Sequence, residues 1–376
     1  MAERSGSGRT LACILVGLGA LFVVAAILIP TYTVSKLAKT PLDLEITSVA
    51  VTPPEGGEVL DARSLSAPGK LEVNTKVPLL SQRFFTVEEP ADSKKMTIQA
   101  GSTLRRTDRQ GDTGLLTASI DRVTIDRKTG EPVDDPIGTI QVQNDKPGDE
   151  VSHVGLQYRF PFDTEKKSYP YFDINSRSTT DINFVEETEI NGMKVYHFNQ
   201  KIAPVDLSKV VNSPTNKLSL PADKWGVEGG EAPITMTRWY ENERDIWVDP
   251  VTGTVIKGQE KPFQYYARSA NAPEVTVLKG TLTYNEDTIE NQIKKAKDGK
   301  DKLSLYGRTV PIILGILGVL LLIAGLFLGF RSGGGRDRTA NPTYGPPGTG
   351  GAAPNLSKGD SWDSGRTEQL PRVTDR

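Results

Sequence analysis

The chain contains, at residues 11–29 and 310–330, the uncharged apolar runs LACILVGLGALFVVAAILI and VPIILGILGVLLLIAGLFLGF. At 1.5 Å of rise per helical residue, each run makes a helix of roughly 30 Å, which is the thickness of the hydrocarbon core of a bilayer. Both runs are therefore predicted to be transmembrane helices. Residues 30–309, between them, are too polar to lie in lipid and numerous enough to bury a core of their own.

The first apolar run has features of both a signal peptide and a membrane anchor. Arg4 and Arg9 precede it, as in a signal peptide. However, the run is longer than the usual apolar region of about 7 to 15 residues, and PTYTVSK follows it in place of a small-residue cleavage site. We therefore predict an uncleaved signal-anchor, with a removable signal peptide as the alternative.

The charges that flank the two runs predict the topology. Arg4 and Arg9 lie before the first run, and Arg331 follows the second. Basic residues close to a membrane helix favour the cytoplasmic side, whereas charges in a very long loop have little influence. We expect a two-pass cell-membrane protein in which residues 1–10 and 331–376 are cytoplasmic and residues 30–309 lie outside. Residues 331–376 are rich in Gly and Pro and are predicted to be disordered.

The composition excludes several classes of function. The formal net charge is -2, and no basic domain is present, so we predict no nucleic-acid partner. A single cysteine cannot form a disulfide within the chain. The two histidines have no metal-binding spacing, and no motif for a nucleophile or a phosphate loop occurs. We therefore expect a protein that is not an enzyme, with no catalytic residues, no metal and no cofactor.

The pattern between the two apolar runs is typical of antiparallel β-structure. Apolar and polar residues alternate at residues 42–46 and 70–74, as they do in half-buried strands. Further strands are expected at 95–107, 137–143, 234–241 and 274–284, and helical periodicity is confined mostly to 288–302. The fold class is therefore a mainly β (α+β) domain of antiparallel strands, flanked by two single transmembrane helices. Whether this domain forms one lobe or two is left open by the spacing.

Three short segments have the chemistry of hairpin turns. Asn191-Gly192 lies between two strand-like runs and tolerates the positive φ angles of a tight primed turn. Residues 126–130 and 249–253 share the pattern Asp-x-x-Thr-Gly, in which the Asp side chain binds the backbone ahead and the Gly supplies a left-handed residue. We predict a hairpin at each of the three.

Aromatic residues concentrate in one segment of the domain, residues 155–173. Large rings often form the core, and this is the simpler interpretation. The alternative is a binding site, because sites for apolar ligands are lined largely by aromatic and hydrophobic side chains. The candidate ligand-binding residues in this segment are Tyr158, Phe160, Phe162 and Tyr171.

The same segment carries a resemblance to a known family. The stretch GLQYRFPFDTEKKSY at 155–169, the turn at Asn191-Gly192 followed by VYHF, and RDIWVDPVTG at 244–253 occur in this order between the two anchors. In this arrangement the chain resembles an actinobacterial envelope-protein family that carries the name porin PorA. The resemblance covers residues 11–330 and implies a membrane protein of the actinobacterial cell envelope. No functional residue is assigned in that family, so none is transferred.

Three functions remain as hypotheses. In the first, the domain binds or relays a hydrophobic envelope component, with membrane lipids or another envelope component as its partner. In the second, which the family name implies, the chain forms a channel, with homo-oligomers made through the transmembrane helices. In the third, the protein is a structural or signalling scaffold. An apolar cavity favours the first, a polar-lined pore between helices the second, and a solid core the third.

Overall fold

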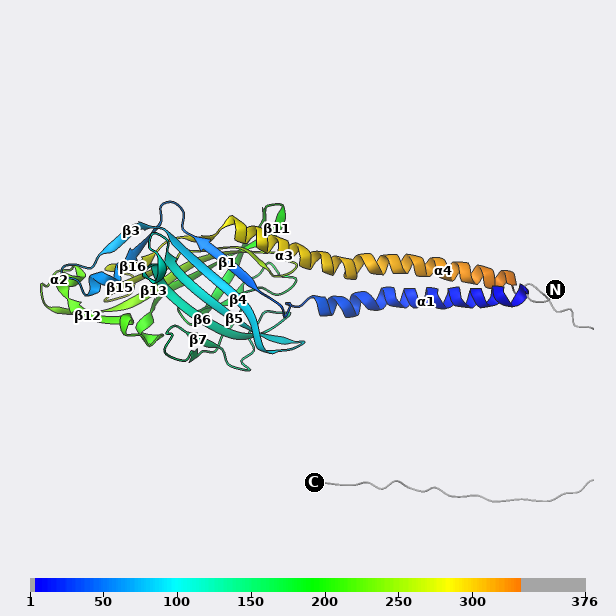
Figure 1. The fold of residues 1–376 in the computed structure, drawn as a ribbon, viewed down its shortest axis with the longest axis horizontal. Coiled ribbons are helices and arrows are strands. Elements are labelled where there is room, and N and C mark those ends of the chain that lie inside the picture. Colours follow the sequence, from blue (N-terminus) through cyan, green and yellow to red (C-terminus); the bar gives the residue numbers. More distant parts are fainter. Residues whose placement is uncertain (1–3, 333–376) are drawn as a thin grey trace, which may run out of the picture.

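The computed structural model describes residues 4–332, which form a β-rich domain and a pair of long helices that project from one end of it (Figure 1). The predicted disordered segment lies almost wholly outside the described residues. The helices are α1 (Arg4–Leu37), α2 (Ala222–Trp225), α3 (Glu286–Ser304) and α4 (Val310–Ser332). The first eight strands are β1 (Ile46–Val51), β2 (Gly57–Leu60), β3 (Val73–Val77), β4 (Leu79–Ala91), β5 (Lys95–Arg106), β6 (Leu115–Asp126), β7 (Thr139–Gln141) and β8 (Asp149–Glu150). The remaining strands are β9 (Tyr169–Asp173), β10 (Ser178–Ile190), β11 (Met193–Asp206), β12 (Lys217–Pro221), β13 (Pro233–Val248), β14 (Val255–Glu260), β15 (Phe263–Ala267), β16 (Val275–Lys279) and β17 (Leu282–Tyr284).

The two apolar runs form the expected helices, α1 and α4, which lie side by side and antiparallel (Figure 1). Segments that include them, Gly8–Leu37 and Glu286–Arg331, are long and apolar enough to cross a membrane. Glycines allow the two backbones to approach closely, since a Cβ atom built on Gly19 would lie 2.8 Å from the carbonyl oxygen of Gly318. α4 is joined to α3 by one π-helical turn, Leu305–Thr309, so the two form a continuous rod.

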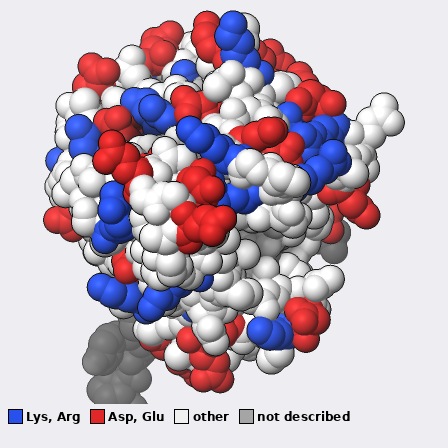
Figure 2. All heavy atoms as spheres, turned by 90° about the vertical axis from the view of Figure 1, so that its left-hand side faces the viewer, with Lys and Arg blue, Asp and Glu red and all other residues white. Residues whose placement is uncertain are grey.

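The strands form one antiparallel sheet that curves into a barrel. From one edge the order is β8-β7-β6-β5-β4-β1-β17-β14-β13-β11-β10-β9. The beginning of the long strand β13 pairs with β12 and its middle with β15, from which β16, β2 and β3 extend the sheet. Between β9 and β6 the wall is completed by residues 151–162, which bridge to β9 at Leu156 and Tyr171. At the end of the domain remote from the helices, Lys and Arg are interspersed with Asp and Glu (Figure 2).

The predicted turns are confirmed. Asn191 and Gly192 join β10 to β11 with φ angles of 47° and 77°, and Ile190 pairs directly with Met193. Gly253, with φ 69°, ends the turn between β13 and β14. The turn at 126–130 also forms, but the strand that follows it is reduced to a single bridge between β6 and Pro132.

Several predicted strands have other bounds in the structure: the segment 70–74 is shifted to β3 (Val73–Val77), the segment 137–143 is shortened to β7, and the segment 234–241 is part of the longer β13. The segment 42–46 is not a strand, because the chain is still crossing from α1 into the barrel there, and β1 begins only at Ile46. The segment 274–284 is divided into β16 and β17, which pair with different neighbours: β16 with β15 and β2, and β17 with β14 and β1. The expected helix at 288–302 is α3, which begins two residues earlier and is capped by Asn285.

Apolar clusters fill the barrel and its outer flank. One cluster inside the wall contains Phe160, Phe198, Ile246 and their neighbours. On another side, α3 buries Ile293 and Ala296 against β11 and β14, which is the burial that its helical periodicity predicts. The domain is thus a barrel with its own core, and its α3 continues into the membrane helix.

Candidate functional site

A cavity of about 640 Å³ lies in the half of the barrel nearest the membrane helices. Its lining includes Lys36 and Leu37 at the end of α1 and Lys302 and Leu303 near the end of α3. The cavity therefore extends to the junction where the domain meets the two membrane helices.

The cavity exists because the sheet is split between β1 and β14. The short strand β17 joins these two strands only through Ala50 and Val51 on one side and Gln259 and Glu260 on the other. Nearer the membrane, β1 and β14 have no pairing with each other in the described sheet.

Helix α3 fills the split and forms one wall of the cavity. Lys295 Nζ donates a hydrogen bond to the carbonyl oxygen of Glu45 at 2.7 Å, just before β1. Gln292 Nε2 donates to the carbonyl oxygen of Val255 at 3.0 Å, on β14. Exposed backbone acceptors at the two sheet edges are thereby satisfied by side chains of one helix.

The residues of β4 give the order of depth in the cavity. The membrane-proximal end of this strand is its turn into β5, where Lys39 Nζ donates to the carbonyl oxygen of Ser93 at 2.6 Å. Every second residue in this part of β4 lines the cavity, namely Ser81, Arg83 and Phe85. Because side chains two apart share one face of a strand, Phe85 is nearest the membrane, Arg83 is deeper and Ser81 is deepest.

The opposite wall has the same order. On β13, Ile246 lies nearer the membrane end than Arg244, and on β14 Val255 lies nearer than Glu260, since Lys300 of α3 bonds Asp249 in the turn that joins these two strands. Inside the charged mouth, an apolar zone therefore comes first, and a polar zone lies behind it. The apolar lining nearest the membrane consists of Leu37, Leu44, Ile46, Phe85, Phe162, Ile246 and Val255.

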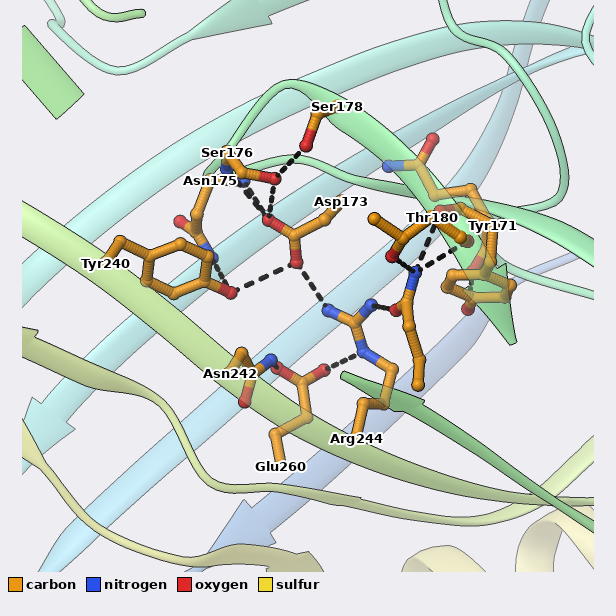
Figure 3. Close-up of polar contacts among 12 residues, drawn as sticks. Tyr171, Asp173, Asn175, Ser176, Ser178, Thr180, Tyr240, Asn242, Arg244 and Glu260 are labelled. Atoms are coloured by element: carbon orange, nitrogen blue, oxygen red, sulfur yellow. Dashed lines mark hydrogen bonds and ion pairs between the residues drawn. The ribbon is translucent and has the colours of Figure 1, made fainter. Parts of the chain in front are cut away.

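The polar zone is organised around the buried guanidinium of Arg244 (Figure 3). It bonds Asp173 Oδ2 through Nη2 at 2.8 Å, Glu260 Oε1 through Nε at 3.2 Å and Gln200 Oε1 through Nη1 at 2.5 Å. Arg83 Nη2 also bonds Glu260 Oε1, at 3.1 Å. Burial raises the pKa of Glu260, but the guanidiniums of Arg244 and Arg83 outweigh it and lower the pKa to about 2. Glu260 is therefore ionised at neutral pH and forms ion pairs with both Arg83 and Arg244.

A second buried cluster holds residues 151–162 against β6. Asp121, which is 0% exposed, accepts hydrogen bonds from His153 Nε2 at 2.9 Å, Gln157 Nε2 at 2.8 Å and the Tyr158 hydroxyl at 2.5 Å. Burial, reinforced by the Asp121 carboxylate, raises the pKa of Tyr158 well above its ordinary value. The Tyr171 hydroxyl donates to the carbonyl oxygen of Gln157. These contacts position Gln157, Tyr158 and Tyr171 in the cavity wall.

Cations surround the mouth of the cavity. Arg127 Nε donates to the carbonyl oxygen of Thr40 at 2.8 Å, and Arg159 Nη2 donates to that of Thr252 at 2.9 Å. Burial lowers the pKa of Arg159 to about 10 and lowers that of Lys295. The mouth carries a formal net positive charge, because its lining contains six cations, Lys36, Lys39, Arg127, Arg159, Lys295 and Lys302, and three carboxylates, Asp43, Glu45 and Asp298.

Three of the four predicted site residues line the cavity, and the fourth lies in the core. Tyr158, Phe162 and Tyr171 line the cavity. Phe160 is 0% exposed and packs in the core, with its ring 4.7 Å from that of Phe198, so it does not line the cavity. The aromatic segment therefore contributes to both the core and the cavity.

Sequence reasoning missed the polar zone. Arg83 is far from Arg244 and Glu260 in the sequence, and the motif that contains Arg244, residues 244–253, has no assigned role. One signal was present: Arg244 lies two residues before Ile246 and four before Val248, so the period of two places it on the buried face of β13. A charged residue at such a position requires a partner, because an unpaired buried charge is costly.

Other titratable groups have structural roles. Asp126 Oδ1 accepts hydrogen bonds from the backbone of Lys128 and Thr129 and so closes its own turn. His197 Nε2 bonds Asp245 Oδ1 at 2.8 Å, and its ring stacks on Trp247. Within residues 4–332, no group of three or more His, Cys, Asp or Glu side chains is arranged to hold a metal ion.

Comparisons with known proteins agree with this architecture. The family model described as Porin PorA matches residues 11–327, which include most of both long helices and the whole barrel. A protein named Porin PorA from Corynebacterium amycolatum is 32% identical over 386 residues, covering 86% of this chain and 99% of the relative. A second one, from Corynebacterium resistens, is 33% identical over 402 residues, covering 86% of this chain and 97% of the relative.

Proposed function

The chain belongs to the porin PorA family, and from this premise we propose that it is a non-enzymatic membrane protein of the cell envelope whose barrel domain binds or relays a lipid-like envelope component. The cavity carries this proposal. Its volume of about 640 Å³ is within the range of small-molecule sites, and its apolar zone lies beside the two helices that are apolar enough to enter a bilayer. A molecule that leaves the bilayer along these helices meets the mouth first.

The test is lipid loading of the purified full chain. The protein is extracted from membranes in detergent, exchanged into a detergent that does not contain acyl esters, and analysed for bound lipid by mass spectrometry. We expect a lipid at a fixed ratio to protein. The variant Phe162→Asp removes an apolar ring from the apolar zone and is expected to reduce loading at least tenfold, because a hydrated carboxylate beside Arg159 cannot pack against an acyl chain.

Phe184→Asp is the matched control. Both rings are partly buried beneath a cation, Arg159 over Phe162 at 4.7 Å and Lys166 over Phe184 at 5.9 Å, but Phe184 does not line the cavity. Lipid-free wild-type protein, or equal loading of the two variants, would contradict the proposal. Phe160 is unsuitable for this test, because a charge at its fully buried position would disrupt the core.

A channel is the second candidate, and the name of the relatives supports it. In this candidate, several copies of α1 and α4 assemble around a conducting path. The described faces of these helices that are open to the surroundings carry large apolar side chains, such as Leu21, Ile27, Ile316 and Phe327. Purified full chain in a planar bilayer tests this candidate: unitary conductance steps at several protein concentrations would support a channel, and their absence would favour the lipid-binding function.

A further inference from the structure

The cavity has a direction, because its apolar and polar zones follow one another along the same strands. Phe85, Ile246 and Val255 lie toward the membrane, and Arg83, Arg244 and Glu260 lie behind them. A ligand with an apolar chain and a polar head can match both zones in one orientation only. We propose that the cavity binds a single-chain amphiphile head-inward, with its chain pointing toward the bilayer and its head group at Arg83. This inference rests on the proposed function.

Arg83 is the group that is available to a head group. Among the described residues, its side chain makes one hydrogen bond, from Nη2 to Glu260. The Arg83 side chain retains 29% of its exposure, and this surface faces the cavity, since Arg83 lies on the inward row of β4. A guanidinium carries five N–H donors, so most of the donors of Arg83 remain free to bind an oxygen acceptor.

Arg244 is not available in the same way. Its side chain is 5% exposed, and all three of its nitrogens are bonded to Asp173, Gln200 or Glu260. Its role is to hold Glu260, which in turn fixes the guanidinium of Arg83. Arg244 is therefore a positioning residue, and Arg83 is the residue that contacts the ligand.

The charges around Arg83 favour an uncharged head. Arg83 and Arg244 carry two positive charges, and Asp173 and Glu260 carry two negative charges, so the four side chains sum to zero. An ester or hydroxyl head can accept hydrogen bonds from Arg83 without adding a charge to this balanced cluster. A free carboxylate bound to Arg83 would instead lie close to the carboxylate of Glu260, and the two negative charges would repel each other.

The cations at the mouth do not require the opposite orientation. Lys39 bonds Ser93, Lys295 bonds Glu45 and Arg127 bonds Thr40, in each case at a backbone carbonyl. These side chains fasten the linker after α1 and the helix α3 to the barrel. These cations lie at the mouth of the cavity, on the membrane side of the apolar zone.

The experiment uses two photoreactive glycerol monoesters of a C18 chain with the full protein in phosphatidylcholine nanodiscs. One probe carries a diazirine at the carbon next to the ester, and the other carries it at the terminal carbon. After irradiation, labelled peptides are mapped by mass spectrometry. We expect the ester-proximal diazirine to label the β4 peptide around Ser81 and Arg83, and the terminal diazirine to label the segment around Phe162.

The reverse pattern of labels would overturn the head-inward orientation while leaving lipid binding intact. Absence of any label from either probe in the barrel would instead contradict the proposed function itself. The two failures are therefore distinguishable in one experiment.

Two variants test the assignment of Arg83. Arg83→Met is expected to raise the probe concentration for half-maximal labelling by about tenfold or more, the size of effect typical for loss of a hydrogen bond to a charged group. For a hydrocarbon probe that carries a terminal diazirine but no oxygen, Arg83→Met should leave the concentration for half-maximal labelling unchanged. Arg238→Met is the matched control, because Arg238 is also half-buried on a strand and bonds a single side chain, Gln264, outside the cavity. Equal effects of the two variants, or no effect of Arg83→Met on folded protein, would overturn the assignment.

The carboxylic acid of the same chain completes the series. Weaker labelling by the acid than by the monoester at neutral pH is the expected result. Stronger labelling by the acid would overturn the preference for an uncharged head. If Arg83→Met does not fold, Arg83→Lys provides the second test: a lysine keeps the charge but has fewer donors in a different geometry, so monoester labelling should still weaken.

Discussion

Glu260 connects the polar zone of the cavity to the acid stability of the barrel. Its pKa in the folded state is about 2, below the ordinary value of 4.5. A lowered carboxylate pKa stabilises the fold at pH values above the ordinary pKa, and this stabilisation is lost as the pH falls through the folded pKa. We therefore expect part of the stability to disappear between about pH 4.5 and pH 2, on the order of 3 kcal/mol.

Urea unfolding of the full chain in detergent, followed by circular dichroism from pH 7 to pH 2.5, measures this loss. Glu260→Gln should flatten the decline in the acid range, whereas Glu228→Gln, at an exposed carboxylate, should leave it unchanged. A Glu260→Gln profile parallel to that of the wild type would show that the carboxylate is not the source of the acid sensitivity.

Gly192 tests the backbone of the hairpin between β10 and β11. Its φ of 77° disfavours a β-branched residue, and no atom lies within 4 Å of a Cβ built there, so strain alone would act. Gly192→Val should lower the free energy of unfolding by about 1 to 2 kcal/mol. Gly101→Val is the control, because Gly101 lies within β5 and the nearest atom to its added Cβ is 3.9 Å away. Equal melting temperatures for Gly192→Val and wild type would contradict the primed turn.

At the scale of elements, the α1–α4 pair is testable by cross-linking. A Cβ on Gly329 would lie 3.9 Å from the Cβ of Ala12, within the range found in disulfides. In a Cys13→Ser background, the double variant Ala12→Cys, Gly329→Cys should oxidise within one chain. The product is a band that migrates differently on non-reducing gels without doubling its mass.

Adding Gly318→Leu should reduce this cross-link, because a side chain there meets Gly19 and Val23 on α1. Gly17→Leu should not reduce it, since nothing lies within 4 Å of a Cβ on Gly17. Formation of the cross-link mainly between two chains would indicate that the helices pair between copies instead.

Helix α3 should be held to the barrel mainly by its apolar face. Ile293 is 6% exposed and packs in a cluster with residues of β11 and β14, whereas the neighbouring Lys294 is exposed. Ile293→Ala should cost about 2 to 4 kcal/mol of stability, and Lys294→Ala less than about 0.5 kcal/mol. Chemical unfolding of both variants provides the comparison, and similar losses would contradict this packing.

Local patterns predicted the elements better than they predicted the site. The anchors, α3 and the primed turn follow from short-range chemistry, namely apolar length, helical period and the Asn191-Gly192 pair. The strand expected at 274–284 was split because its pairing partners are distant in the sequence. The polar zone was missed for the same reason: Arg83 and Glu260 become neighbours only when β17 joins β1 to β14. Three of the four predicted aromatic residues line the cavity, but no periodicity distinguished Phe160 from them.

For the whole molecule, the arginines beside the apolar runs predict which side of the membrane holds the barrel. We expect both termini to be cytoplasmic and the first span to be retained. Protease added to intact spheroplasts should degrade the barrel and leave a C-terminal tag protected, and N-terminal sequencing should find the original start of the chain. A protected barrel, or a mature N-terminus near residue 30, would refute this topology.

The rod made by α3 and α4 joins the wall of the cavity to the bilayer. A transmembrane helix adjusts its tilt to the thickness of the surrounding membrane. Because α3 continues directly into α4 through the turn Leu305–Thr309, a change in the tilt of α4 would also change the direction of α3 relative to the barrel. Such a change would alter the hydrogen bond of Gln292 to Val255 on one side of the split and that of Lys295 to Glu45 on the other. We therefore expect membrane thickness, a property of the lipid, to influence how tightly α3 covers the split between β1 and β14.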